Sequence, residues 1–354
     1  MPLDAAVTAS APVPAVRMRR EGSMPDLDRV AAAIGVPALT AYLVWSRGTD
    51  DEALMRRMLA PSLKQLRPPT EMAGFEAALD LLQQAKTEGW RVGIFGDYDV
   101  DGVTTATILS GYLEAIGIEV VVRVAHRERG YGFGVADAQA LHQSGAKLVL
   151  CGDTGTSDIE ALGWLREHGV RSVVIDHHQV PEVAPPTDAL INPHQEGCGF
   201  PFKGLCSAGV AFYLCAGLRT RLSKTTNERM PDPRALLDLV ALATVCDMMP
   251  LADENRVLVA SGLRHLQQRG RPGVAALSIE PASTSSSRST RRTWASSSGR
   301  GSTRRGDWVR PSPPCICSAR VRHPKRAHSP TVSTCSTSSA SVRPSASSPK
   351  RVRC

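Results

Sequence analysis

Three aspartates lie at alternate positions in the stretch GDYDVDG, residues 96–102, directly after the apolar run RVGIF. Carboxylates held this close together repel one another unless a cation lies among them. A single acid at the end of an apolar run often serves only as the N-cap of a helix, but three together favour a metal site. Asp97, Asp99 and Asp101 are therefore candidate metal ligands, and Gly102 allows the chain to turn close beside them.

Other apolar runs also end in acidic or imidazole side chains. KLVLCG is followed by DTGTS, RSVVI by DHH, and ALATVC by DMMPL, which adds the candidates Asp153, Asp176, His177, His178 and Asp247. Carboxylates select Mg²⁺ or Mn²⁺, and imidazole shifts the preference towards Mn²⁺. Several carboxylates suit two ions a few ångströms apart, which activate a water and stabilise both oxygens of an in-line phosphoryl displacement. Asp247 also fits a simpler interpretation, an acid at the end of an apolar helix.

The periodicity of apolar residues predicts the elements that position these groups. Helical spacing occurs before the first acidic motif, over residues 26–33, 38–46, 50–58 and 71–88. Short apolar runs typical of buried strands then alternate with helical stretches, the strands being expected over residues 91–96, 119–125, 147–152 and 171–176. Three further helices are expected over residues 207–222, 233–248 and 254–270. The predicted fold class is α/β, with a doubly wound, mainly parallel sheet, whose ligands collect beyond the carboxyl ends of the strands.

The C-terminal part of the chain has a different composition. Residues 279–354 contain no Leu, Phe or Tyr and hold fifteen Lys and Arg against two acids, a net charge of +13. The 354-residue chain carries +8 in total, so residues 1–278 carry −5, and the overall basic charge is no argument for nucleic-acid binding by the folded part. The tail has too little apolar surface to offset its chain entropy and is predicted to be disordered, as is an N-terminal extension over residues 1–24.

The remaining features indicate a cytoplasmic protein with no membrane partner. No apolar run approaches the roughly 20 residues that a bilayer requires, and the N-terminus lacks the basic start and apolar core of a signal peptide. The nine cysteines form no CxxC pair, and those in apolar runs are interpreted as buried free thiols.

In chain order, GDYDVDG, DTGTS, DHH and ATVCDMMPL resemble the motifs of the DHH phosphoesterase superfamily. Within it they are most similar to the RecJ family, the single-stranded-DNA-specific 5′→3′ exonucleases of bacteria. SRGTDDEALMRRMLAPSLKQL, RERGYGFG and INPHQEGCGFPFKGLCSAGVAFYL support the resemblance, which covers about residues 38–270. It implies a DHH phosphoesterase domain over residues 91–270, preceded by a helical segment over residues 25–90. The implied reaction releases 5′-mononucleotides, in DNA recombination and repair.

The resemblance also implies two bound Mn²⁺ ions, or Mg²⁺ in their place. Carried onto this sequence, Asp99 and Asp153 hold the first ion. The second ion has as ligands Asp101, Asp153, His177 and Asp247, so that Asp153 bridges the pair. Asp97 and Asp176 complete or orient the site, and His178 lies near the scissile phosphate. These last three are the candidate catalytic residues.

Two further implications concern positions around the centre. Many relatives have a His where this chain has Phe95, which predicts a weaker first metal site or one that relies on Asp97. The stretch RERGYGFG resembles a substrate-facing loop, in which a base stacks on Tyr131 while Arg127 or Arg129 meets a phosphate; a solvated turn is the alternative. Single-stranded DNA is the implied partner, with single-strand-binding protein and a RecQ-type helicase as further partners.

RecJ-like chains continue past the position of residue 270 into a second domain with a motif resembling GFQLGPRxNAAGR. This chain has TWASSSGRGSTRRGDWV at residues 293–309 instead. Read from the third base of each codon, with permitted choices for the unspecified base, that stretch gives LGFQLGPRVNAAGRLG. The match indicates a frameshift, in the gene or its sequencing, between about Leu277 and Thr293, which replaces the second domain. A genuine basic tail that binds nucleic acid is the rival interpretation.

Two other functions remain open at this point. One is a DHH phosphoesterase of small substrates, such as short oligonucleotides, cyclic dinucleotides or pyrophosphate. The other is a non-catalytic scaffold that keeps the fold, although a scaffold predicts eroded ligands and only Phe95 departs from the family's pattern. The primary prediction is a metal-dependent exonuclease with little processive activity, because the crevice normally closed by two domains stands open.

Overall fold

The computed structural model describes residues 26–47, 51–226, 228–268 and 270–277. The segments expected to be disordered, residues 1–24 and 279–354, lie outside this described part. None of the described helices is long and apolar enough to span a membrane by itself. Helices α1 (Leu27–Ile34) and α2 (Ala38–Trp45) reach the required length and hydropathy only as a pair, and the chain bends by 99° between them.

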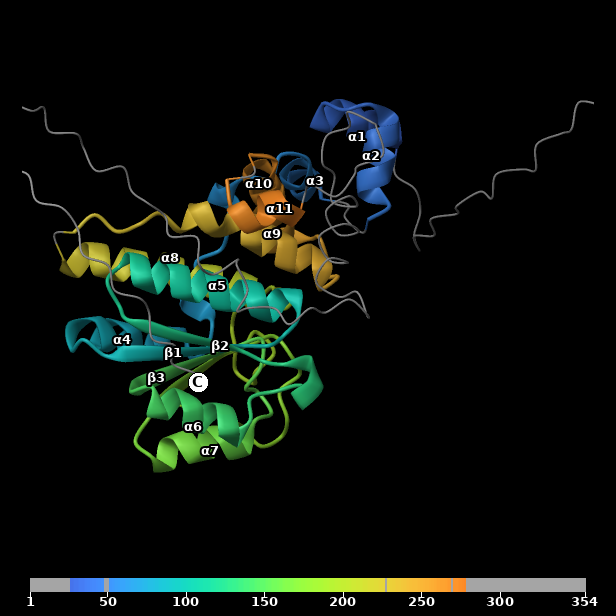
Figure 1. Cartoon of the computed structure of the whole chain (residues 1–354). Coiled ribbons are helices and arrows are strands. Elements are labelled where there is room, and N and C mark those ends of the chain that lie inside the picture. The colour runs from blue at the N-terminus through green and yellow to red at the C-terminus, as the bar shows by residue number, and fades with distance from the viewer. Residues whose placement is uncertain (1–25, 48–50, 227, 269, 278–354) are drawn as a thin grey trace, which may run out of the picture. The chain divides into compact units, whose positions relative to one another are not determined.

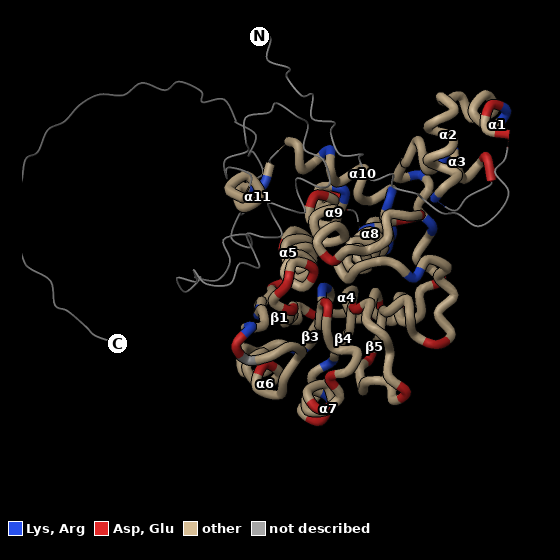
Figure 2. The backbone as a smooth tube through the Cα atoms, turned by 90° about the vertical axis from the view of Figure 1, so that its right-hand side faces the viewer, with Lys and Arg blue, Asp and Glu red and all other residues tan. Residues whose placement is uncertain are grey.

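Five parallel strands form one sheet, in the spatial order β2-β1-β3-β4-β5 (Figures 1 and 2). Their bounds are β1 Arg91–Gly96, β2 Val120–Val124, β3 Ala146–Gly152, β4 Arg171–Ile175 and β5 Ala189–Ile191. The first four lie where the apolar runs predict strands, and the parallel, doubly wound fold is confirmed. The patterns do not predict β5, because its three residues carry too little periodicity to be recognised; it pairs with β4.

Helices cover both faces of the sheet because successive side chains of a strand point to opposite sides. The helices concerned are α4 Phe75–Thr87, α5 Val100–Ala115, α6 Val135–Gln143, α7 Ile159–Glu167, α8 Ser207–Thr225 and α9 Leu237–Cys246. In β1, Ile94 faces the larger core, built with α4, α5, α8 and α9, whereas Phe95 faces the smaller core built with α6 and α7. Figures 1 and 2 show α5, α8 and α9 on one side of the sheet and α6 and α7 on the other.

The helix expected over residues 71–88 begins only at Phe75. Gly74 takes a left-handed conformation, with φ of 75°, and this conformation cannot continue a right-handed helix. The residues before it form a short 3₁₀ turn, Pro69–Glu71. The side chains of α4 then pack into the larger core, so this helix is part of the layer that covers the sheet.

The N-terminal helices and the last helices pack outside the sheet layers. Helices α1, α2 and α3 (Glu52–Leu59) share a small apolar cluster that includes Trp45 and Met55. Helix α10 (Asp253–Gln267) packs on α9, and α11 (Pro272–Leu277) follows it. Arg67 donates hydrogen bonds to both carboxylate oxygens of Glu254, at 2.7 and 2.6 Å, which joins the segment before α4 to α10.

Candidate metal centre

The carboxyl ends of β1, β3 and β4 meet at one edge of the sheet and carry predicted acids. Asp97 follows β1, Asp153 follows β3 and Asp176 follows β4, and all three are buried. A fourth acid comes from outside the sheet, because Asp247 is the C-cap of α9. Strand order and the end of one helix therefore bring together groups that lie far apart in the sequence.

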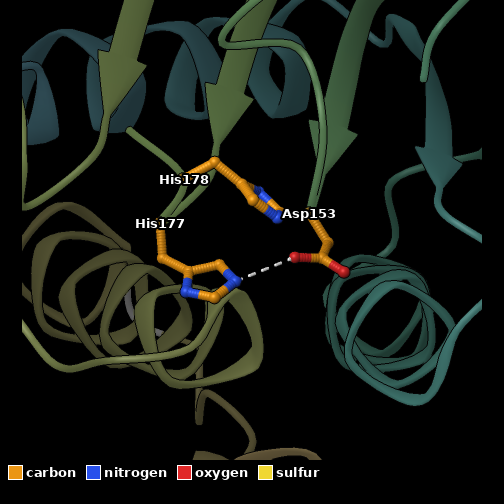
Figure 3. A group of neighbouring side chains, drawn as sticks. All are labelled: Asp153, His177 and His178. Carbon is orange, nitrogen blue, oxygen red and sulfur yellow. Dashed lines mark ion pairs between the residues drawn. The ribbon is translucent and has the colours of Figure 1, made fainter. Parts of the chain in front are cut away.

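His177 lies among these acids, and its ring points towards Asp153 (Figure 3). Its Nε2 is 3.2 Å from Asp153 Oδ1, 3.6 Å from Asp247 Oδ2 and 3.7 Å from Asp101 Oδ2. Acids from three other segments of the chain thus converge on one imidazole nitrogen.

The candidate ligand atoms form overlapping sets, and within each set all the atoms lie within 4.8 Å of one another. The sets are Asp97, Asp99 and Asp153; Asp101, His177 and Asp247; and Asp153, His177 and His178. Asp153 and His177 each belong to two of these sets, and the sharing of Asp153 between two ions stays a prediction. Asp97 joins the set of Asp99, whereas Asp176 belongs to none of them.

The first turn of α5 places two of the acids. Asp99 is the N-cap, and its Oδ1 accepts a hydrogen bond from the Gly102 N–H at 2.9 Å. The carboxylate of Asp101 accepts hydrogen bonds from the backbone N–H groups of Ser207 and Ala208, at 2.7 and 2.9 Å. These are the first amides of α8, so the positive end of that helix dipole holds a buried carboxylate in a fixed orientation.

Asp176 orients a histidine. Its Oδ1 accepts hydrogen bonds from His178 Nδ1 and from the His177 backbone N–H, both at 2.7 Å. Burial favours a higher pKa for Asp176, but the hydrogen bonds from His178 and Thr156 outweigh it and lower the pKa to about 2. The same hydrogen bond to Asp176 raises the pKa of His178. The hydrogen bond between the two side chains therefore fixes the orientation of the His178 ring.

The outer face of His178 meets the loop between β2 and α6. Tyr131 donates a hydrogen bond to the Asp153 carbonyl at 3.2 Å, and its hydroxyl lies 3.3 Å from the ring nitrogens of His178. The His178 side chain is 46% exposed. It is thus held at the border of the centre, where a bound molecule can reach it.

Burial raises the pKa of four acids in the centre, because desolvation disfavours the charged form. The pKa of Asp97 rises to about 6. That of Asp247 also rises to about 6, through burial and then through the charge of Asp101. Burial likewise raises the pKa of Asp101, and it raises that of Asp153 well above its usual range. Each of these shifts reflects the cost of holding a carboxylate away from water.

The donor set fits divalent cations. Asp97 Oδ1 and Asp247 Oδ2 are buried and, among the described residues, have no hydrogen-bond partner. Within the same described ranges, only His177 and His178 form ion pairs with acids of the centre, and no Lys or Arg does so. Buried carboxylates without a positive partner are costly, and a divalent ion among them removes that cost. Oxygen donors with an imidazole suit Mn²⁺ or Mg²⁺.

The other positions predicted from the sequence, Arg127, Arg129 and Phe95, lie outside the ligand sets. Arg127 is exposed and lies over the ring of Tyr98, with its guanidinium carbon 5.1 Å from the ring centre. Arg129 ends a 3₁₀ turn, Arg127–Arg129, but its side chain lies outside the described part. Phe95 is fully buried against Phe133, with ring centres 4.9 Å apart, so it serves packing on the α6 and α7 side of the sheet.

The sequence patterns miss two residues that support the centre. Ser207 Oγ donates a hydrogen bond to Asp153 Oδ1 at 3.1 Å, in addition to its backbone contact with Asp101. Asn192 Nδ2 donates to the His178 carbonyl at 2.9 Å, which fixes the turn after β4. Both residues lie in the stretch INPHQEGCGFPFKGLCSAGVAFYL. The resemblance of this stretch to relatives indicates that it matters, but nothing in its spacing points to these two side chains.

A family model described as the N-terminal domain of the DHH family matches residues 91–244. Residues 91–244 belong to the DHH family. The matched range runs from β1 into α9 and contains every candidate ligand of the DHH domain except Asp247, which follows three residues later. The expected extension of this domain to residue 270 stays a prediction.

Relatives similar to this chain are described as the single-stranded-DNA-specific exonuclease RecJ. The single-stranded-DNA-specific exonuclease RecJ of Haemophilus influenzae is 38% identical over 222 residues, which are 61% of this chain and 39% of that protein. RecJ of Escherichia coli is 35% identical over 250 residues, 68% of this chain and 43% of that protein. The chain therefore spans about two fifths of the length of these relatives.

Two solved structures are similar to the chain. The crystal structure of exonuclease RecJ bound to manganese aligns with a TM-score of 0.57 and 30% identity, over 66% of this chain and 57% of that chain. RecJ from Thermus thermophilus in complex with Mn²⁺ aligns with a TM-score of 0.59 and 30% identity, over 71% of this chain and 35% of that chain.

Ser207→Ala is expected to weaken Mn²⁺ binding by roughly 10–100-fold, because groups that orient metal ligands have effects of this size. The variant loses the hydrogen bond to Asp153 but keeps the backbone bond to Asp101. Isothermal titration with Mn²⁺ measures the change. Ser110→Ala is the matched control, since Ser110 is a buried helical serine that bonds to the Thr107 carbonyl instead. Equal affinities for the wild type and Ser207→Ala would contradict the expected role.

Proposed function

We propose that this chain is the phosphoesterase part of a single-stranded-DNA-specific 5′→3′ exonuclease, which hydrolyses phosphodiesters and releases 5′-mononucleotides. The observation that carries the proposal is the convergence of Asp101, Asp153, Asp247 and His177 at the carboxyl edge of the sheet. The similarity to RecJ proteins supports the substrate class. The cellular role that follows is DNA recombination and repair in the cytoplasm.

Two divalent ions, Mn²⁺ or Mg²⁺, are proposed to lie between the overlapping ligand sets. Asp97, Asp99 and Asp153 would hold one ion, and the second would be held by Asp101, Asp153, His177 and Asp247. When bound, such a pair supplies positive charge that activates the attacking water and stabilises the phosphoryl oxygens.

The remaining residues of the centre position the ligands and the substrate. The amides of Ser207 and Ala208 fix Asp101, and Asp176 fixes the ring of His178. The raised pKa of His178 favours the protonated form of its ring, which is suited to donate a hydrogen bond to a phosphate oxygen. Tyr131, which is 57% exposed beside His178, offers a surface for a base.

The strand is proposed to bind weakly, because the frame-shifted region replaces the second domain that RecJ-like chains have. The recovered motif in residues 293–309 supports this part of the proposal. Sequencing the gene from about codon 270 onward tests it. An intact reading frame that encodes the tail as printed would disprove the frameshift, and single-strand-binding protein and a RecQ-type helicase are proposed partners of the frame-restored protein.

The activity is tested with oligonucleotides labelled at the 5′ or the 3′ end, in Mn²⁺ and in EDTA. We expect Mn²⁺-dependent release of 5′-mononucleotides from single strands, with dissociation after one or a few cleavages, and no cleavage of blunt duplexes. Processive degradation like that of a full-length relative would show that the second domain is dispensable. Hydrolysis of dinucleotides or pyrophosphate without attack on long strands would favour the small-substrate alternative.

A further inference from the structure

The turn that ends α9 has an unusual backbone. Met248 adopts a left-handed conformation, with φ of 58°. Its N–H donates to the Val245 carbonyl and the Met249 N–H donates to the Thr244 carbonyl, at 3.3 and 3.1 Å. This is the helix-ending turn in which glycine is favoured, because a side chain at such a φ costs free energy. A methionine at this position therefore requires an explanation other than backbone stability.

The side chain of Met248 is directed to solvent. It is 87% exposed, more than any other large apolar side chain in the described ranges of the chain. Its neighbour Met249 is partly buried and packs against the larger core. Met249 thus serves packing, whereas the left-handed Met248 does not.

Met248 borders the metal centre. It directly follows Asp247, whose Oδ2 lies 3.6 Å from His177 Nε2. Tyr131, also an exposed large side chain, borders the same centre through its contacts with His178 and the Asp153 carbonyl. Two exposed side chains on separate segments thus lie next to residues of the centre, Met248 along the chain and Tyr131 by contact, and a thioether makes favourable contacts with aromatic rings.

We propose that Met248 packs against the base of the terminal nucleotide when its phosphate is held at the metal centre, and so makes the enzyme prefer a base-bearing 5′ end. The inference rests on the proposed function. The base contact explains why a side chain occupies the strained position. The turn then places a metal ligand, Asp247, and a base contact, Met248, at consecutive residues.

The test uses Met248→Gly in the full chain and two single strands that differ only at the 5′-terminal residue, which is either a normal nucleotide or an abasic one. For the wild type we expect kcat/KM on the normal strand to exceed that on the abasic strand by about 2–10-fold, the range of a sulfur–aromatic contact. Met248→Gly is expected to remove this preference. The same variant is expected to melt about 2–4 °C higher, because glycine relieves the left-handed residue.

A higher melting temperature together with a lost substrate preference in Met248→Gly would exclude a merely structural role for Met248. Met248→Leu should retain most of the preference, since it keeps an apolar side chain. Leu39→Ala is the matched control, because Leu39 is 70% exposed on α2, which contributes no residue to the ligand sets. An equal preference in wild type and Met248→Gly, or equal loss of activity on both strands, would overturn the inference.

Binding of the two strands, measured by fluorescence anisotropy, separates this inference from the proposed function. A wild-type chain that binds the base-bearing end more tightly through Met248 but cleaves nothing would contradict the exonuclease and support the base contact. A chain that cleaves single strands without any Met248-dependent preference would support the exonuclease and contradict the base contact. Absence of both cleavage and binding would overturn both.

Discussion

Asp153→Asn is expected to reduce single-strand hydrolysis by about a thousandfold, because metal ions contribute several kcal/mol of transition-state stabilisation and about 1.4 kcal/mol corresponds to a factor of ten. Asp153 is a proposed ligand of both ions, since it lies in one set with Asp97 and Asp99 and 3.2 Å from His177, so its loss is expected to disturb both. Initial rates on a 5′-labelled strand in Mn²⁺ measure the effect.

Asparagine is the informative replacement at this position. Asp153 has a φ of 62°, a conformation that Asn tolerates better than most residues. It also keeps an oxygen that can accept the hydrogen bond from Ser207. We therefore expect the metal-free variant to melt at or above the wild-type temperature, because a buried carboxylate that is repelled by Asp101 and Asp99 is gone, while the rise in melting temperature on adding Mn²⁺ is lost.

Asp137→Asn is the control for Asp153→Asn. Asp137 lies on α6 and pairs with Arg123 at 3.0 Å, so its loss removes a carboxylate without touching the ligand sets. This variant should keep both the hydrolysis rate and the response to Mn²⁺. Full activity with undiminished metal stabilisation in Asp153→Asn would show that Asp153 is not a shared ligand.

Gly102→Ala is expected to destabilise the fold by about 3 kcal/mol and to abolish hydrolysis, since overpacking against rigid backbone has costs of this order. A Cβ at Gly102 would lie 2.5 Å from the Asp97 backbone nitrogen and 2.6 Å from its carbonyl oxygen. To relieve the clash, the start of α5 must move away from the end of β1. That movement carries Asp99 and Asp101 out of position. Urea unfolding followed by circular dichroism measures the loss of stability.

Gly111→Ala in the same helix separates the clash from the general effect of replacing glycine. A Cβ at Gly111 has no atom within 4 Å, and alanine in a helix is favoured over glycine by about 0.5–1 kcal/mol. This variant should be as stable as the wild type or slightly more stable, with unchanged hydrolysis. Similar stability of the Gly102→Ala and Gly111→Ala variants would show that the close approach at Gly102 is not required.

The strands and main helices of the DHH domain follow from local pattern. Runs such as KLVLCG are apolar throughout because both faces of a parallel strand are buried, and the helices between them have the spacing of one covered face. Acids at strand ends predicted a site at the carboxyl edge, since parallel order brings those ends together. Short elements with little pattern were not predictable, as β5 shows.

The sequence by itself determined the type of sheet, the edge at which chemistry takes place and the residue types available there. Only the tertiary structure decided which acid faces which. It places Asp101 against the first amides of α8, it gives Asp176 to His178 and not to a ligand set, and it turns Phe95 into the opposite core. The contact of Asp101 with α8 joins residues 106 and 107 positions apart, so it is set by how α8 packs on the sheet and by no local periodicity. The contact of Asp176 with His178 is local, but it depends on how the turn after β4 orients the two side chains. Alternation along β1 puts Phe95 opposite Ile94, and only packing decides which helices cover each face.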